Sequence, residues 1–354
     1  MVKKQKFLEL EAVRGVAALM VTLYHFPTFS PIYENPVIRN GDLMVDLFFV
    51  ISGFVISYNY FDNIGSSDKL VAFQKKRFWR LYPLHLLTFL VFVIIDLTRI
   101  VMNGESGESP ESWKLALYNL LLVQALFADE LSYNFPSWSI STEFLTYFVF
   151  ACIAMMAGRL KSAIMLTMFV ASAALCWHLD AFHNVVGYPI LRCFYGFFAG
   201  VLVHRFYEGG DHRRYGWLLS PIIWSLVSIA TMAFYDRLAA WLPVVIFSLL
   251  VASLAVHAGS SHMTNLLNSR FLQHLGKVSY SIYMWHIAIV FVFIRILQTV
   301  FGYGGEFVPN VGIKLDMGAG VASLVTMLYL LSIIVISSYS YHAVEMRFMK
   351  RKKA

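Results

Sequence analysis

The first apolar segment of the chain carries an arginine and, after ten intervening residues, a histidine. These are Arg14 and His25, in the run from Glu9 to Phe26, and on one helix they would lie roughly 16 Å apart along the axis. A charged side chain inside a membrane helix is costly unless it faces a cavity or a partner, so Arg14 predicts a functional site. The alternative is that its long stem carries the guanidinium to the membrane surface.

Two carboxylates are predicted at the depth of His25 in other apolar segments. Asp46 lies roughly 6 Å inside its segment and Glu143, in SWSISTEF, about 8 to 9 Å inside its own. Imidazole titrates near neutrality and a neighbouring carboxylate fixes its tautomer, so the three side chains predict acid–base chemistry. Two alternatives stay open, because buried polar side chains also hold helices together and serve proton-coupled transporters.

A cationic stretch, KKRFWRLYP, borders the third apolar run. Arg77 and Arg80 lie at positions i and i+3, on one face of a helix. Forked donors that keep their charge suit phosphate groups, so the pair, with Tyr82 beside it, predicts a phosphate site. Lys75 and Lys76 are interpreted as positive-inside anchors, which is also the alternative for the two arginines.

The composition fixes the class of protein that must position these groups. Of the 354 residues, 58% are hydrophobic and 14% are charged, and the mean hydropathy is +0.64. These values indicate a multi-pass membrane protein and exclude a soluble enzyme. The net charge of +7 comes from basic residues in short loops, so it reports topology and not nucleic-acid binding. The three cysteines have no metal-ligand spacing, and no metal site is expected.

The sequence predicts an all-α integral membrane protein of one domain, residues 1–354, with about ten transmembrane helices. A shorter run, 113–128, is predicted to be interfacial or re-entrant, because counting it as a span would break the asymmetry of basic residues between the two sides. That asymmetry places both termini in the cytoplasm, with a short basic tail at 343–354 that contacts membrane lipid. The apolar runs are 8–28, 42–61, 79–101, 138–158, 162–178, 187–204, 217–235, 239–257, 275–298 and 318–341.

Six stretches of the chain, taken in order, carry a family resemblance. They are LEAVRGVAALMVTLYH, GDLMVDLFFVISGF, RFWRLYP, SWSISTEFLTY, GKVSYSIYMWH and YHAVEMRF. Together they resemble the acyltransferase-3 family of bacterial integral-membrane acyltransferases, and the similarity spans nearly the whole chain. The closing stretch departs from the family's usual Glu-x-Pro pattern, because Met346 and Arg347 follow Glu345.

The resemblance implies a membrane-bound O-acyltransferase. Such a protein moves an acetyl or related acyl group from cytoplasmic acetyl-CoA to a hydroxyl of an extracytoplasmic carbohydrate. The resemblance further implies that His25 is catalytic, that Arg14 handles acyl-CoA, and that Arg77 and Arg80 are the second arginine motif. Glu143 matches the acidic position of the tryptophan-serine motif. The acceptor-side candidates beside it are Trp138, Ser139 and Ser141.

The predicted mechanism uses His25 as general base toward a sugar hydroxyl, oriented by Glu143 or Asp46, with direct transfer or an acyl-enzyme as open routes. The acceptor, a polysaccharide, O-antigen or glycolipid, docks there, most of a bilayer thickness from the arginine pair. No permanently bound cofactor and no nucleic-acid partner are expected, and the predicted location is the bacterial cytoplasmic membrane. His286, in SYSIYMWH, is interpreted as a packing residue, with a proton relay as the alternative.

A second class of function competes with this interpretation. A proton-coupled transporter for a sugar or an organic acid would also use intramembrane charge. Such a transporter has no use for a cytoplasmic phosphate site, so the arginine pair favours the enzyme.

Overall fold

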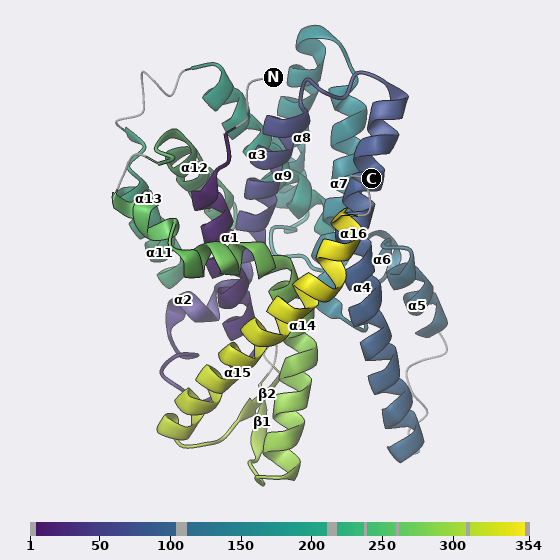
Figure 1. Ribbon diagram of the computed structural model, residues 1–354, viewed down its shortest axis with the longest axis vertical. Helices are drawn as coiled ribbons and strands as arrows, with labels where there is room; N and C mark the ends of the chain where they lie inside the picture. The colour runs from purple at the N-terminus through teal and green to yellow at the C-terminus, as the bar shows by residue number, and fades with distance from the viewer. Residues whose placement is uncertain are drawn as a thin grey trace.

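The computed structural model describes residues 5–103, 112–210, 218–236, 239–259, 262–308 and 312–350, so the end of the predicted basic tail, 351–354, lies outside the described residues. Its helices form a bundle elongated along one axis (Figure 1). The long helices are α1 Leu8–Tyr24, α3 Met44–Tyr60, α4 Ser67–Asn103, α7 Trp138–Ala154, α8 Gly158–His178, α9 Pro189–Glu208, α11 Pro221–Ala233, α12 Leu242–Val256, α14 Arg270–Thr299 and α15 Ala319–Ser340. The shorter ones are α2 Pro36–Arg39, α5 Ser112–Leu120, α6 Gln124–Phe127, α13 His262–Leu267 and α16 Met346–Lys350.

The long helices overlap the ten apolar runs that the sequence predicts as spans. Within the described parts of the chain, six helical stretches are long and apolar enough to cross a membrane. They are Gly41–Tyr60, Ser67–Thr98, Phe135–Ala154, Gly158–His178, Arg270–Thr299 and Ala319–Met349. These stretches support a mainly helical, multi-pass membrane protein, while the number of ten crossings stays a prediction.

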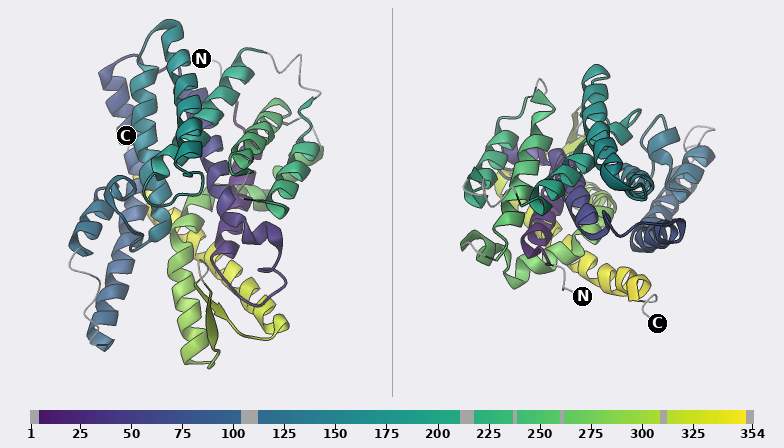
Figure 2. Two further views of the ribbon diagram at one scale, coloured as in Figure 1. Left: turned by 180° about the vertical axis from the view of Figure 1, so that it is seen from behind. Right: turned by 90° about the horizontal axis from the view of Figure 1, so that it is seen from above.

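The long helices differ in how much of their surface is covered. Most of α3 is buried, whereas α8 and α15 expose many apolar side chains. The later part of α15 (yellow) lies at the edge of the bundle in the view from above (Figure 2). In a membrane, such apolar helix faces contact lipid, because a helix satisfies its own backbone polar groups.

The predicted interfacial segment 113–128 forms two short helices, α5 and α6. The chain breaks between them at Leu122, whose φ of 58° lies in the left-handed region. The Leu122 carbonyl accepts a hydrogen bond of 2.8 Å from the Ser141 hydroxyl of α7, and the Gln124 amide donates to Ser137. The segment therefore covers the first turns of α7, and neither helix is long enough to cross a bilayer.

Glycines let α3 and α9 approach each other backbone to backbone. A Cβ atom on Gly53 would lie 1.8 Å from the Phe197 carbonyl oxygen, and one on Gly200 would lie 2.0 Å from the Val50 carbonyl oxygen. Small residues at such contacts are typical of close helix pairs in membranes. The pair places Ser52 of α3 in the interior of the bundle.

Helices α1 and α14 run parallel and in register. A Cβ atom on Gly15 would lie 2.6 Å from the backbone nitrogen of Gly276, and His25, at the end of α1, contacts His286 of α14. The second contact lies ten residues beyond the first in both helices. Equal offsets on two helices of equal rise mean that they point the same way without axial slip.

The structure also contains a β-hairpin, which the sequence did not predict. β1 Gly305–Val308 and β2 Gly312–Leu315 pair antiparallel, and Leu315 bridges to Thr28 in the loop after α1. The chain leaves α14 through Gly302, whose φ of 69° favours glycine and ends the helix. A short ribbon with open edges is compatible with a position outside the hydrocarbon core, where water satisfies its backbone.

An ion pair ties this hairpin to the loop that follows His25. The Lys314 ammonium donates to the Glu34 carboxylate and lies 4.0 Å from the centre of the Phe29 ring. The hydrogen bond from Lys314 lowers the pKa of Glu34 below its ordinary value. The hairpin is thus attached to the same end of α1 that carries the histidine.

Candidate active site

A small cavity lies between α1, α3, α7 and α14, inside the bundle. Its volume is about 50 Å³. Aromatic and aliphatic side chains form part of the wall, and polar groups form the rest. The polar lining consists of Arg14, Ser52, Ser139, Glu143, Ser279, Tyr280 and Tyr283. Three of the predicted site residues, Arg14, Ser139 and Glu143, therefore line one cavity.

Glu143 is fixed at the cavity wall by two hydroxyl groups. Its Oε1 atom accepts hydrogen bonds from Ser52 of α3 and from Tyr147, one turn further along α7. Its Oε2 atom forms no hydrogen bond with the residues that the structure describes. A carboxylate oxygen accepts about two hydrogen bonds, so Oε2 is available to a ligand in the cavity.

Arg14 supplies the positive charge of the cavity. Within the described ranges its guanidinium forms no hydrogen bond, and its nearest charged groups include Arg80 and Glu143. A guanidinium has five donors, so Arg14 can donate hydrogen bonds to a ligand in the cavity that it lines. The placement agrees with the prediction that Arg14 faces a cavity, and its role toward acyl-CoA stays a prediction.

Arg77 lies in a cage of aromatic rings. Its guanidinium carbon is 5.5 Å from the centre of the Tyr60 ring, 5.6 Å from that of Phe73 and 5.9 Å from that of Tyr147. One terminal nitrogen donates to the Tyr60 hydroxyl at 3.4 Å. The Nε atom is buried and has no hydrogen-bond partner in the described chain. Cation–π contacts thus hold the charge while one donor stays unused.

Arg80 lies one turn further along α4 and adjoins the cavity. The Arg80 guanidinium interacts electrostatically with Arg14 and with Glu345. The Glu345 carboxylate is buried and accepts a hydrogen bond from Ser281. The sequence placed the arginine pair most of a bilayer thickness from Glu143. In the structure, Arg80 and Glu143 are both electrostatic neighbours of Arg14, so they belong to the same end of the site.

His25 pairs with His286 rather than with a carboxylate. The His286 Nε2 atom lies 3.3 Å from His25 Nδ1, and the ring centres are 4.9 Å apart. His25 Nδ1 is also 2.9 Å from the Val21 carbonyl, and His286 Nδ1 is 2.5 Å from the Tyr283 carbonyl. Tyr283 lines the cavity, so the histidine pair stands next to its wall.

These contacts define the tautomers of the two imidazoles. A backbone carbonyl only accepts, so each Nδ1 atom carries its proton. His286 Nε2 then has a lone pair and accepts from the same His25 Nδ1–H that donates to Val21. His25 Nε2 is left with a lone pair and no contact to a protein hydrogen-bond partner among the described residues. An imidazole held in this way can act as a general base.

Asp46 does not contact His25. Its two oxygens accept hydrogen bonds of 2.8 and 3.0 Å from Arg192 of α9, and both side chains are buried. The Arg192 guanidinium also lies 5.5 Å from the centre of the Trp138 ring. Both carboxylate oxygens are therefore engaged in an ion pair between α3 and α9, which corrects the prediction that Asp46 orients the histidine.

His25, Asp46 and Glu143 therefore do not contact one another in the structure. His25, Asp46 and Glu143 belong to three separate clusters. One reason lies at the start of α7, where Trp138 and Ser137 are already buried beneath α5 and α6. The first turn of α7 is therefore covered by other protein segments, which a count of residues from Trp138 does not take into account.

The remaining candidates divide between the cavity and the scaffold. Ser139 lines the cavity and shares a hydrogen bond of 2.8 Å with the Tyr283 hydroxyl. Ser141 anchors the α5–α6 segment, as described above. Tyr82 donates to the Leu120 carbonyl at 3.0 Å, so its hydroxyl binds α5 instead of the arginine pair. Only Ser139 among these keeps a position at the site.

The sequence analysis missed Tyr280 and Tyr283 of the site, and it interpreted His286 as a packing residue with a proton relay as the alternative. Tyr280, Tyr283 and His286 lie on one buried face of α14, within the stretch SYSIYMWH. The spacing of three residues between them was a usable signal, because i and i+3 share a helix face. Arg192 was missed although it is an arginine inside an apolar run, which is the same signal that singled out Arg14.

The site is thus a cavity with opposite charges, next to a histidine pair and inside apolar helices. The described residues contain no group of three or more metal-ligating side chains. Residues 7–342 match the acyltransferase domain of the acyltransferase-3 family, and the chain belongs to this family. The assignment decides between the two classes of function left open by the sequence, in favour of the acyltransferase.

Two curated relatives share parts of the chain. A stretch of 115 residues is 36% identical to acyltransferase MdmB of Streptomyces mycarofaciens, covering 31% of this chain and 27% of that protein. A stretch of 165 residues is 31% identical to protein 2 in the picA locus of Rhizobium radiobacter, covering 42% of this chain and 82% of that protein. The match to MdmB thus spans about a quarter of its length. No solved structure matches the chain.

Proposed function

We propose that the protein moves an acetyl group from cytoplasmic acetyl-CoA to a hydroxyl of an extracytoplasmic carbohydrate, such as a polysaccharide, O-antigen or glycolipid. One observation carries the proposal. The arginine pair, the cavity and the histidine pair follow one another along the bundle. Arg14, which lines the cavity, and His25, at the end of α1, are separated by roughly 16 Å of helix.

The donor side of the proposal uses the arginines. Arg77 and Arg80 bind phosphates of CoA, because each offers guanidinium donors not used by the protein. The pantetheine arm then passes Arg14 and enters the cavity, which brings the thioester toward Tyr283 and the histidine pair. Tyr82 has no part in this site, since its hydroxyl is bound to α5.

The chemistry needs one base and no covalent intermediate. His25 Nε2 takes the proton from the acceptor hydroxyl as the oxygen attacks the thioester carbonyl carbon. The carbon–sulfur bond breaks, and the departing CoA thiolate takes the proton back from His25. His286 Nε2 accepts the hydrogen bond from His25 Nδ1–H while the imidazolium exists. That bond stabilises the charge in the way that a carboxylate does in other triads.

The proposed topology has ten crossings, both termini in the cytoplasm and a location in the bacterial cytoplasmic membrane. Parallel α1 and α14 require an odd number of crossings between them, and the described residues between them form seven long helices. Counting α5–α6 as a crossing would reverse α14. Cysteines replacing Val101 and Glu130, both exposed residues on either side of this segment, should react alike with an impermeant thiol reagent. Opposite labelling would refute the topology.

The proposal is tested on the cell surface. Mass spectrometry of surface polysaccharide and glycolipid should show O-acetyl groups in cells that make the protein, and their loss when the gene is deleted. Restoring the wild-type protein should restore the groups, whereas His25→Ala should not. Identical acetylation in all these strains would refute the proposed acceptor class.

A further inference from the structure

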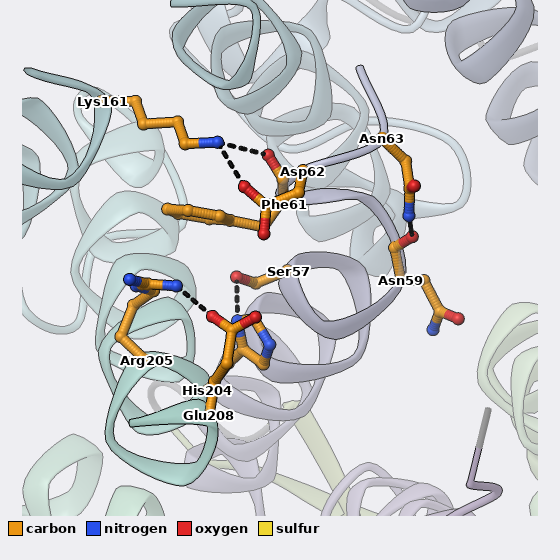
Figure 3. Close-up of polar contacts among 9 residues, drawn as sticks. All are labelled: Ser57, Asn59, Phe61, Asp62, Asn63, Lys161, His204, Arg205 and Glu208. Atoms are coloured by element: carbon orange, nitrogen blue, oxygen red, sulfur yellow. Dashed lines mark hydrogen bonds and ion pairs between the residues drawn. The ribbon is translucent and has the colours of Figure 1, made fainter. Parts of the chain in front are cut away.

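A second polar pocket lies outside the active site, at the ends of α3, α8 and α9. Its volume is about 520 Å³. Figure 3 shows the side chains of Lys161 and Arg205 on either side of Phe61, the residue after α3. Arg159 of α8 also lines the pocket. Three cations from two helices therefore surround one space that the proposed mechanism does not use.

Two of these cations are held in place by Phe61. The Lys161 ammonium lies 4.4 Å from the centre of the ring and the Arg205 guanidinium lies 4.5 Å from it. Lys161 donates to the Phe61 carbonyl and to Asp62, and Arg205 donates to Glu208. A lysine has three donors and an arginine five, so both retain donors for a ligand. The pocket is preorganised by cation–π contacts and ion pairs.

The charge of the pocket favours an anion. Three cations face two carboxylates, Asp62 and Glu208, so one positive charge is in excess. Arg159 forms no hydrogen bond or ion pair with the residues that the structure describes. A phosphodiester carries one negative charge and oxygen acceptors, and it therefore matches both the excess charge and the unused donors.

The surface beside the pocket fits hydrocarbon chains. Leu166, Val170 and Trp177 of α8 are 49%, 55% and 68% exposed. They lie 7, 11 and 18 residues after Arg159, which are near-multiples of a helical turn, so all four share one stripe of α8. An apolar stripe that starts at an exposed cation is the pattern expected beneath a lipid headgroup.

We propose that this pocket binds the headgroup phosphate of an anionic phospholipid whose chains lie along α8. In the proposed topology it opens at the cytoplasmic membrane surface, where anionic lipid is available. The bound phosphate joins the ends of α8 and α9 next to the end of α3. It thereby braces the α3–α9 pair, which carries Ser52 and the Asp46–Arg192 ion pair.

The test compares two double variants of the full-length protein in lipid nanodiscs. Arg159→Gln with Lys161→Gln removes two positive charges from the pocket. Lys69→Gln with Lys75→Gln is the matched control, because it removes two exposed positive charges from the start of α4. The melting temperature of each protein is measured in phosphatidylcholine alone and with phosphatidylglycerol added. For each protein, the melting temperature in phosphatidylcholine alone is subtracted from the one with phosphatidylglycerol. A variant that is equally destabilised in both lipids therefore does not obscure the result.

We expect phosphatidylglycerol to raise the melting temperature of the wild type and of the control by several degrees, and the pocket variant to lose most of that shift. An undiminished shift in the pocket variant would overturn the proposal. An equal loss in the control would also overturn it, because general attraction to a charged membrane would then explain the effect. A pocket variant that keeps its lipid shift but loses stabilisation by acetyl-CoA would assign the pocket to the donor instead.

Discussion

Replacing His286 by leucine isolates what the second imidazole contributes. In the wild type, His25 Nδ1–H is shared between the Val21 carbonyl at 2.9 Å and His286 Nε2 at 3.3 Å. Leucine removes the second acceptor and leaves the first, so His25 keeps its tautomer. The substitution therefore removes a hydrogen bond that stabilises the His25 imidazolium formed during the reaction. Hydrogen bonds to charged groups contribute about 1.5–3 kcal/mol. At 1.36 kcal/mol per tenfold in rate, kcat should fall roughly 10- to 150-fold.

The assay is steady-state acetyl transfer by purified protein in nanodiscs, with CoA release followed over time. His286→Gln should recover part of the loss, because its amide oxygen can accept from His25. His274→Leu is the matched control. His274 lies on α14, as His286 does, and the substitution removes its hydrogen bond of 2.8 Å to Ser338. Its kcat should stay near that of the wild type.

The KM for acetyl-CoA should change little in His286→Leu, because the arginines that bind the donor are untouched. The reasoning would be refuted if His286→Leu kept the wild-type kcat. It would also be refuted if glutamine and leucine variants of equal thermal stability were equally slow, since His286 would then act through packing alone.

Three further predictions test other parts of the account. Gly53→Ala should lower the melting temperature sharply or prevent accumulation, because its Cβ would lie 1.8 Å from a carbonyl of α9, whereas Gly65→Ala, with open space around it, should not. Arg80→Ala should weaken acetyl-CoA binding, measured by calorimetry, by about 1.5–3 kcal/mol, and Arg80→Lys should recover only part of it. The Lys314 hydrogen bond holds the pKa of Glu34 below its ordinary value, so this pair stabilises the hairpin at higher pH and loses its effect as the pH falls through that lowered pKa. Amide exchange in 312–315, corrected for intrinsic rates, should therefore accelerate as the pH falls through the lowered pKa of Glu34, and Glu34→Gln should remove this pH dependence.

The helical segments and the importance of Arg14 could be predicted from the sequence, because both depend on local composition. Each predicted apolar run corresponds to a helix, and an arginine in a membrane helix needs a cavity or a partner. The β-hairpin could not be predicted in this way. Its strands are four residues each, and they are defined by pairing with each other and with the loop after α1.

The position of a residue along its helix could not predict which other site residues it contacts. Asp46 was assigned to the histidine, but its partner Arg192 lies 146 residues away on α9. Depth along a helix says nothing about which neighbour its face meets, and that is set by helix packing. His286 meets His25 because Gly15 and Gly276 bring α1 and α14 into register, and this register is a property of two surfaces together.

The most direct test of the proposed function uses sealed proteoliposomes with one orientation of the protein. Acetyl-CoA with a radiolabelled acetyl group is supplied only to the cytoplasmic face, and the carbohydrate acceptor only to the opposite face. With the wild-type protein, label should appear on the carbohydrate across the membrane, and with His25→Ala it should not. Label that stays on CoA with every carbohydrate acceptor, or equal transfer by His25→Ala, would contradict the proposed function.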